Sequence, residues 1–209
     1  MTAGSAGRLI ALEGIDGCGK STQARTLADR LGALLTFEPG ATELGTSLRS
    51  LLLDPALPAV NERAEALMMA ADRAQHVAEV LDPALGVGRW VVTDRFSAST
   101  IAYQGYGRGM DGADLDRLVS WATGGLRPDL NVLIEVPVAT AVARRAGERH
   151  DRFEELGSGF QQRVSDGFRQ MSADDPDTWV VIDGDRPEAT VADQVWTAVR
   201  DRLGAPARG

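Results

Sequence analysis

Short apolar segments alternate along this chain with longer segments in which apolar residues recur every three or four positions. The apolar segments are nearly continuous, which is typical of strands buried on both faces of a parallel sheet. Strands are predicted over residues 9–13, 33–37, 90–93, 130–136 and 179–182, and helices over residues 22–31, 44–53, 62–81, 113–122, 138–146, 159–173 and 189–203. Strand alternating with helix predicts a doubly wound α/β fold, with ligands bound outside the carboxyl ends of the strands.

Length and composition indicate one globular domain. The chain has 209 residues, of which 44% are hydrophobic and 25% charged, and this size is sufficient to bury a substantial core. We expect the domain to cover residues 8–204, between flexible tails over residues 1–7 and 205–209. No apolar run approaches the roughly 20 residues of a membrane-spanning helix, and the N-terminus does not resemble a signal peptide. We therefore expect no membrane association.

Net charge and cysteine content restrict the class of binding partner and the expected cellular location. The formal net charge of −8 argues against a nucleic-acid polymer as partner, because binding a phosphate backbone needs a basic surface. A small anionic ligand needs only local positive charge and is not excluded. The single cysteine, Cys18, cannot form an internal disulfide and suits the reducing cytoplasm.

A glycine-rich segment of the pattern G-x-x-x-x-G-K-[ST] joins the first predicted strand to the first predicted helix. Backbone N–H groups of such a loop surround phosphate oxygens together with the N-terminus of the helix. The lysine adds a positive charge toward the β- and γ-phosphates. In this strand–loop–helix context the motif predicts nucleoside triphosphate binding by Gly14, Ile15, Asp16, Gly17, Cys18, Gly19, Lys20, Ser21 and Thr22.

The third predicted strand leads directly into Asp94 and Arg95. A carboxylate at the tip of a strand beside the P-loop is the usual second support for Mg²⁺, and the hydroxyl of Ser21 can be a direct ligand. The planar guanidinium of Arg95 offers paired donors to a phosphate, a geometry that lysine cannot reproduce. We therefore predict an Mg²⁺ site at Ser21 and Asp94, and a phosphate contact at Arg95.

Two predicted loops carry arginine. Residues 105–109 read Gly-Tyr-Gly-Arg-Gly and predict a glycine-rich loop. Residues 146–159 hold Arg149 and Arg152 among several carboxylates and few large apolar residues. This composition is typical of a lid that closes over phosphates, although an ordinary solvated loop is the alternative on composition alone.

The predicted helix over residues 62–81 has two distinct faces. Met69, Arg73 and His76 are separated by four and three residues, so their side chains lie along one line. Met69 and Arg73 together could grip a flat heterocycle, but a core methionine and a solvated arginine are the simpler interpretation. His76 is interpreted as structural. The buried stripe is predicted to consist of Leu67, Ala70, Ala74, Val77 and Leu81.

Seven segments in order carry a family resemblance. They cover residues 14–21, 38–42, 48–53, 71–76, 94–99, 102–105 and 127–130. Together they resemble the thymidylate kinases (dTMP kinases) of the bacterial type, from about Arg8 to Leu203. The resemblance implies a P-loop nucleoside-monophosphate kinase with a five-stranded parallel sheet flanked by helices on both faces. It further implies transfer of the γ-phosphate of ATP to dTMP in dTTP biosynthesis, a requirement for Mg²⁺, and a homodimer.

The resemblance also implies roles at the acceptor site. Asp16 matches an acid that contacts the sugar 3′-hydroxyl, and Tyr103 matches a ring that fills the space of a 2′-hydroxyl. Arg73 matches the arginine that reads the thymine carbonyl, and Arg95 the arginine that binds the acceptor phosphate. The implied dTMP-binding set is Asp16, Pro39, Arg49, Met69, Arg73, Arg95, Ser99, Thr100, Tyr103 and Gln104.

The transition-state arginine is implied to come from the lid. Relatives carry it either in the P-loop or in the lid, and the P-loop position is Gly17 here. Arg149 is the first choice and Arg152 the second. The implied catalytic set is Lys20, Arg95, Arg149 and Arg152.

Met69 departs from the family pattern. It stands where many relatives place a phenylalanine on the thymine ring, and a flexible thioether makes a looser platform. This departure concerns the affinity for thymine and not the type of reaction. Separately, two alternatives stay open: a kinase for another pyrimidine monophosphate, such as dUMP, dCMP or UMP, and a non-catalytic ATP-binding switch.

Overall fold

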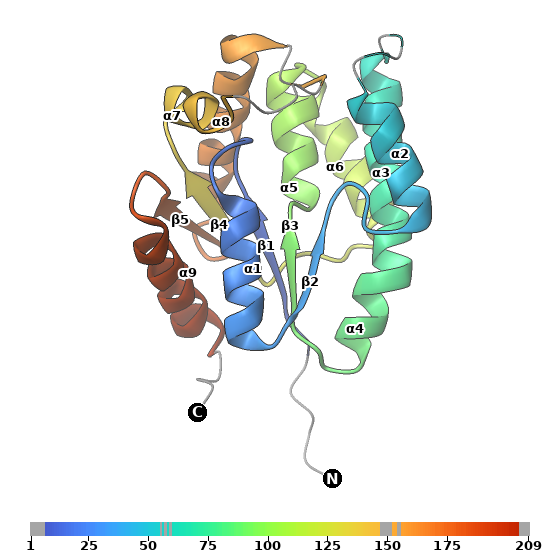
Figure 1. Ribbon diagram of the computed structural model, residues 1–209. Coiled ribbons are helices and arrows are strands. Elements are labelled where there is room, and N and C mark those ends of the chain that lie inside the picture. Colours follow the sequence, from blue (N-terminus) through green and yellow to red (C-terminus); the bar gives the residue numbers. More distant parts are fainter. Residues whose placement is uncertain are drawn as a thin grey trace.

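A five-stranded parallel sheet forms the centre of the molecule. The computed structural model describes residues 7–54, 56, 58, 60–146, 152–153 and 156–204. The strands are β1 (Leu9–Glu13), β2 (Leu34–Phe37), β3 (Val91–Asp94), β4 (Leu130–Glu135) and β5 (Trp179–Asp183). Their order across the sheet is β2-β3-β1-β4-β5, and every neighbouring pair is parallel (Figure 1). The α/β fold with a five-stranded parallel sheet is thereby confirmed, and each predicted strand lies within one residue of its observed bounds.

Helices cover both faces of the sheet. α1 (Lys20–Leu31) and α9 (Glu188–Leu203) pack side by side on one face. The other face is covered by α8 (Gly157–Asp174), α5 (Ser97–Thr100) and the segments η1 (Val77–Leu81) and η2 (Ile101–Gly107). The other described helices are α2 (Glu43–Leu53), α3 (Glu62–His76), α4 (Asp82–Gly86), α6 (Gly112–Ala122) and α7 (Val138–Arg144).

β1 owes its central position to its continuous apolar sequence. All five of its residues are buried, and alternate residues contact different clusters of the core. Ile10 and Leu12 belong to the larger cluster, whereas Leu9 and Ala11 pack with the smaller one. Because β1 pairs with β3 on one side and β4 on the other, whatever follows its carboxyl end lies at the middle of the sheet edge.

Side-chain caps define where several helices begin. The hydroxyl of Thr42 accepts a hydrogen bond from the backbone N–H of Gly45 at the start of α2. Asn61 accepts similarly from Arg63 before α3. These contacts satisfy N–H groups that have no partner in the first helical turn. α2 and α3 thus each begin at a fixed point.

The prediction of a glycine-rich loop over residues 105–109 is wrong. α5 continues into η2, a π-helical segment over Ile101–Gly107. Gly107 is needed for packing, since a Cβ there would lie 2.6 Å from the ring of Phe160 in α8. Gly105 similarly lies against Leu115. The glycines therefore mark close contact between helices, which the sequence pattern alone does not distinguish from a turn.

The helix predicted over residues 62–81 exists, but its buried face differs from the predicted stripe. α3 passes directly into η1, a π-helical segment over Val77–Leu81. Ala70, Val77 and Leu81 are buried as predicted, Ala74 is half-buried, and Leu67 is 58% exposed. The face turned inward instead carries Glu65, Asp72, Arg73 and His76. Ion pairs and hydrogen bonds offset the free-energy cost of burying these polar side chains. Because the face is polar, apolar periodicity in the sequence does not predict it.

Parts of the predicted tails and lid are not described. Apart from Gly7 the tail residues lie outside the described residues, as do residues 147–151, 154 and 155 of the predicted lid. α8 already begins at Gly157, so the last three residues assigned to the lid are helical. In the described part of the chain, no helix combines the length and apolarity that crossing a bilayer requires.

Candidate active site

The P-loop connects the buried end of β1 to the first residue of α1. Gly14, Gly17 and Gly19 have φ values of 141°, 85° and 96°, which favour glycine. A Cβ on Gly17 would also lie 2.3 Å from the carbonyl oxygen of Ala141 in α7. The side chain of Cys18 is buried, and burial raises the pKa of its thiol, so Cys18 is a packing residue of the loop.

Asp16 is the centre of the charged groups at the end of β1. Its carboxylate accepts from Lys20 Nζ at 3.1 Å, from Arg95 Nη2 at 2.6 Å and from the hydroxyl of Tyr103 at 3.0 Å. Burial by itself would raise the pKa of Asp16, but the charges of Arg95 and Lys20 outweigh it and hold that pKa well below its usual range. Asp16 is thus ionised and joins the P-loop to β3 and η2.

Arg95 is held in one orientation by several acceptors. Its Nη1 donates to the Gly14 carbonyl and to the Ser99 hydroxyl, both at 3.0 Å, and its Nη2 also donates to Tyr103. Arg95 is the one non-glycine residue with positive φ among those described, at 72°. Such a conformation in a bulky residue costs free energy and is found where surroundings fix it, typically at functional sites.

Glu13 holds two neighbours of Arg95 in place. Its two carboxylate oxygens accept from the Phe96 backbone N–H at 2.9 Å and from the Ser99 hydroxyl at 2.6 Å. Burial raises the pKa of Glu13 from 4.5 to about 7, only partly offset by these hydrogen bonds and by Arg95. Glu13 was not predicted as a site residue, because a glutamate at the end of a strand carries no distinctive local pattern.

The raised pKa of Glu13 predicts a pH-dependent stability. The folded state binds more protons than the unfolded state between pH 4.5 and about 7, so this group's contribution to stability is lost as pH rises through that window. Relative to the unmodified chain, Glu13→Gln should therefore gain about 2–3 kcal/mol in unfolding free energy between pH 5 and pH 8. Urea unfolding at both pH values measures this. A difference between the two proteins that does not change with pH would contradict the shift.

Ser21 and Asp94 lie together on the α1 side of the loop. The Ser21 hydroxyl donates to Asp94 Oδ2, and the other carboxylate oxygen, Oδ1, is buried without a hydrogen-bond partner among the described residues. An unpartnered buried carboxylate oxygen beside a hydroxyl suits a hard cation that prefers oxygen ligands. No group of three acidic, histidine or cysteine residues that could hold a metal exists in the described part of the chain. A cation here would thus need further ligands, such as phosphate oxygens.

A cavity opens beside Asp16 and Arg95. All ten residues of the expected acceptor set line it, which brings together positions from the P-loop, α2, α3, α5 and η2. Three further lining residues were missed from the sequence, namely Glu38, Leu53 and Phe153. The guanidinium groups of Arg49, Arg73 and Arg95 thus share one cavity, and no part of that expected set lies elsewhere.

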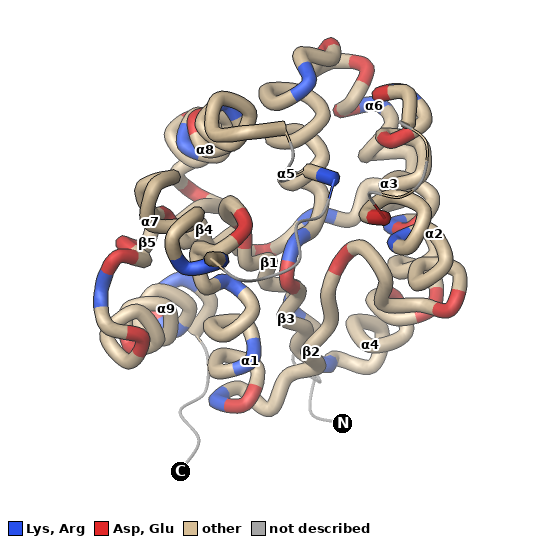
Figure 2. The backbone as a smooth tube through the Cα atoms, turned by 45° about the horizontal axis from the view of Figure 1, so that its top comes forward, with Lys and Arg blue, Asp and Glu red and all other residues tan. Residues whose placement is uncertain are grey.

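A second hollow adjoins the first on the other side of Asp16. Lys20, Ser21 and Asp94 line it, together with further residues of α1 and β2. Asp16, Glu38, Arg49 and Arg95 line both hollows. Figure 2 looks onto this edge of the sheet and shows basic and acidic positions side by side around the ends of β1 and β3. The P-loop and the arginine-lined cavity therefore face one another across shared side chains.

Of the two arginines predicted in the lid, the structure describes only Arg152. Arg149 lies outside the described residues. Arg152 lies at the C-terminal end of α2, where its backbone N–H donates to Leu53 O at 3.4 Å and its Nη2 to Asp54 O at 2.9 Å. The neighbouring Phe153 is buried, with its ring edge-on to Tyr103 at a centroid distance of 5.8 Å. Phe153 thus forms part of one wall of the cavity.

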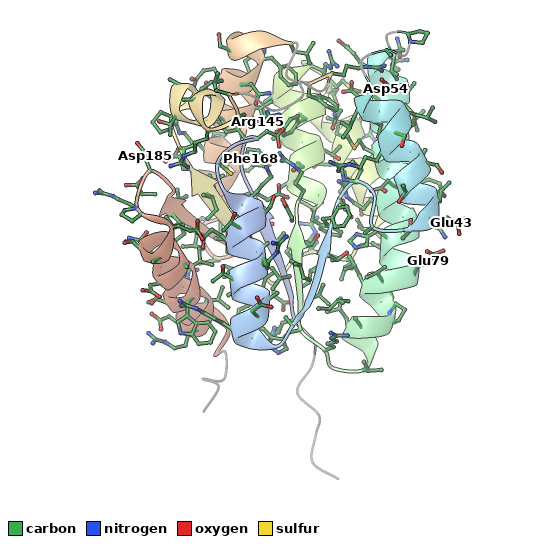
Figure 3. The ribbon with its side chains drawn as sticks, in the orientation of Figure 1. Glu43, Asp54, Glu79, Arg145, Phe168 and Asp185 are labelled. Carbon is green, nitrogen blue, oxygen red and sulfur yellow. The ribbon has the colours of Figure 1, made fainter. Side chains whose placement is uncertain are left out.

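Two arginines that the sequence analysis missed lie beside the P-loop. Arg144 Nη1 donates to the carbonyl of Cys18 at 3.5 Å, and its Nη2 donates to Gly184 O at 3.0 Å. Arg145 lies next to Gly17 and lines a further hollow with Ile15 and Asp16 (Figure 3). The adjacent arginines at the end of the predicted helix over residues 138–146 were the available signal. Their proximity to the P-loop follows only from the order of the strands.

A parallel sheet of this strand order, with a glycine-rich loop leading from its central strand into a helix, is the P-loop NTPase fold. The thymidylate kinase family model matches residues 12–195. A thymidylate kinase of Synechococcus sp. (strain CC9311) is 47% identical over 211 aligned positions, covering 95% of this chain and 98% of the relative. One of Trichlorobacter lovleyi is 44% identical over 209 positions, covering 94% and 99%.

Solved structures agree with the sequence comparison. The crystal structure of thymidylate kinase from Ehrlichia chaffeensis superposes with a TM-score of 0.77 at 31% identity, covering 93% of this chain and 99% of that one. The chain belongs to the thymidylate kinase family.

Proposed function

We propose that this chain transfers the γ-phosphoryl group of ATP directly to dTMP, forming ADP and dTDP. As a member of the thymidylate kinase family it is a nucleoside-monophosphate kinase. The observation that carries the mechanism is the pair of adjoining hollows that share Asp16, Glu38, Arg49 and Arg95. In-line transfer needs a donor phosphate and an acceptor phosphate that face one another, with positive charge between them.

The donor would occupy the P-loop. Backbone N–H groups and the Lys20 ammonium bind the β- and γ-phosphates, since both present positive charge at the start of α1. Lys20 is buried and held by Asp16 and by the Ile15 carbonyl at 3.3 Å, so its ammonium is oriented before ATP arrives. Arg149 is proposed to reach the transferring group from the lid, with Arg152 as the second choice.

The acceptor would occupy the arginine-lined cavity. Arg95 and Arg49 orient the phosphate of dTMP, and Arg49 is itself fixed by a 2.8 Å hydrogen bond to the Pro39 carbonyl. Met69 and Arg73 contact the base, while the ring of Tyr103 excludes a ribose 2′-hydroxyl. The cavity also supports Asp16 near the sugar and Ser99, Thr100 and Gln104 near the base and its edge.

Mg²⁺ is proposed as the cofactor, held with ATP at Ser21 and Asp94. The support is the pairing of their side chains and the unpartnered Asp94 Oδ1. Bound there, the ion would neutralise charge on the β- and γ-phosphates. We also propose a homodimer, as the family resemblance implies, and a cytoplasmic location, which the single cysteine favours.

A coupled ADP-release assay with dTMP, dUMP, dCMP and UMP side by side tests the proposed function. We expect dTMP to give the highest kcat/KM, UMP the lowest, and turnover to stop when EDTA removes divalent cations. Preference for a ribonucleotide would contradict the role of Tyr103. ATP turnover that is indifferent to every monophosphate would instead support a nucleotide-binding switch. Light scattering of the same preparation reads the oligomeric state, and a monomer would contradict the dimer.

A further inference from the structure

A buried chain of hydrogen bonds runs from β2 to the acceptor cavity. Thr36 Oγ1 lies 2.7 Å from Nε2 of His76, and Nδ1 of the same ring lies 2.8 Å from Glu38 Oε1. The other oxygen of Glu38, Oε2, accepts from Arg73 Nε at 2.8 Å. All four residues are buried, and the exposed fraction of the His76 side chain is 0%. The chain thus connects a strand, through the imidazole and a carboxylate, to a guanidinium that lines the cavity.

The donors and acceptors around Glu38 can be assigned. A carboxylate only accepts hydrogen bonds, so the imidazole donates through Nδ1 to Glu38. Nε2 lies on the opposite side of the ring, paired with the Thr36 hydroxyl, which can donate or accept. Both oxygens of Glu38 are therefore engaged in fixed directions, one by His76 and one by Arg73. The carboxylate has little freedom to turn.

Arg73 is fixed on its other sides as well. Nη1 donates to the Thr100 hydroxyl at 2.7 Å, and Nη2 donates to the Phe96 carbonyl at 3.0 Å. These bonds, with the one to Glu38, use three of the five N–H groups of a guanidinium. Two N–H groups remain on a guanidinium that lines the cavity, and a guanidinium cannot accept a hydrogen bond. Arg73 in this orientation accordingly favours a carbonyl oxygen over an amino group.

The same strand-end segment is also held by α3 at a second point. Asp72 Oδ1 accepts from the backbone N–H of Gly40 at 2.9 Å, two residues beyond Glu38. Glu38 therefore cannot follow a displaced Arg73 without disturbing Gly40 and Pro39, which also lines the cavity. An apolar side chain could fill this position without the free-energy cost of burying a carboxylate. Packing alone therefore does not explain a glutamate with both oxygens hydrogen-bonded here.

We infer that Glu38 and His76 are positioning residues, which fix the guanidinium of Arg73 so that the acceptor site discriminates a base carbonyl from a base amino group. The inference rests on the proposed function, since it deepens the role of the acceptor cavity. His76 touches no cavity surface and acts only through Glu38. Loss of the chain frees Arg73 to turn, which weakens dTMP binding in ground state and transition state alike.

Steady-state kinetics of His76→Leu and His76→Asn test this inference. Leucine fills the space but leaves Glu38 Oε1 without a donor, whereas the asparagine amide nitrogen can occupy the position of Nδ1. We expect His76→Leu to raise KM for dTMP about tenfold, with kcat and KM for ATP within about threefold. The preference for dTMP over dCMP should fall about as much, and His76→Asn should restore most of both. Thr123→Val, buried at the end of α6, is the control for loss of stability alone.

The outcomes separate the inference from the proposed function. If His76→Leu does not fold, Glu38→Gln replaces it, because one amide cannot accept from both His76 and Arg73; the same tenfold rise is expected. Equal changes in KM for dTMP and ATP, or a lowered melting temperature with unchanged KM, would overturn the positioning role. If the unmodified chain phosphorylates no monophosphate, the proposed function is wrong. The positioning role can still be tested by measuring the affinity for dTMP by calorimetry. That affinity must then fall about tenfold in His76→Leu, and unchanged affinity overturns the inference.

Discussion

Lys20→Ala is expected to lower kcat/KM by roughly 10²–10³-fold, which corresponds to about 3–4 kcal/mol of transition-state stabilisation. The Lys20 ammonium is the mobile charge of the P-loop, and its loss leaves the charge developing on the transferred phosphoryl group without a donor on that side. The fold should survive, because Asp16 keeps its 2.6 Å ion pair with Arg95. Rates of ADP release with ATP and dTMP measure the effect, and circular dichroism melting checks the fold.

Arg30→Ala is the matched control on the same helix. Arg30 lies in the last turn of α1 and pairs at the surface with Asp193 at 2.8 Å, so the variant removes a cation without approaching the P-loop. Its kcat/KM should stay within about twofold of the unmodified chain. Near-normal turnover in Lys20→Ala would show that the donor phosphates bind elsewhere.

Arg95→Lys should lower kcat/KM for dTMP by roughly 10²-fold or more, although the charge is conserved. Lysine cannot reproduce the fork that now reaches Gly14, Ser99, Asp16 and Tyr103 at once. Removing one partner of such a buried, hydrogen-bonded pair costs on the order of 2–5 kcal/mol. The change should appear mainly in the kinetics with dTMP, because we propose that Arg95 orients the acceptor phosphate, although its side chain also lines the hollow beside Lys20.

Arg117→Lys provides the corresponding control. Arg117 is exposed on α6 and pairs with Asp114 one turn away, so the same substitution there tests only the general effect of replacing arginine by lysine. We expect unchanged kinetics for both substrates. If instead Arg95→Lys raised KM for ATP and left KM for dTMP unchanged, Arg95 would belong to the donor site.

Local sequence sufficed for the parts of the site that depend on local geometry. The P-loop was predicted because its glycines, lysine and serine act within one strand–loop–helix unit. Asp94 and Arg95 were also predicted, since residues that follow parallel strands meet at one edge of the sheet. The pairing of the Ser21 hydroxyl with Asp94 is the structural counterpart of that expectation.

Residues whose partners are distant in the chain were not predictable in this way. Glu13, Glu38 and Phe153 carry no distinctive local pattern, and their positions follow from how β1, β2 and the lid meet around the cavity. His76 was interpreted as structural because a single imidazole on a helix says nothing about its neighbours. Arg73 illustrates the intermediate case. Periodicity placed it on a helix face, but only the family resemblance assigned it to the base. In the structure, Arg73 and Arg95 line the same cavity.

The central claim is that the donor and acceptor phosphates bind in adjoining hollows that share Asp16, Glu38, Arg49 and Arg95. An inhibitor in which adenosine and thymidine are joined 5′ to 5′ through a pentaphosphate tests this most directly by calorimetry and competition. The account predicts that it displaces both ATP and dTMP and binds at least tenfold more tightly than either, because linking makes the second contact intramolecular. Competition with only one of the two nucleotides, or affinity no better than theirs, would contradict the claim.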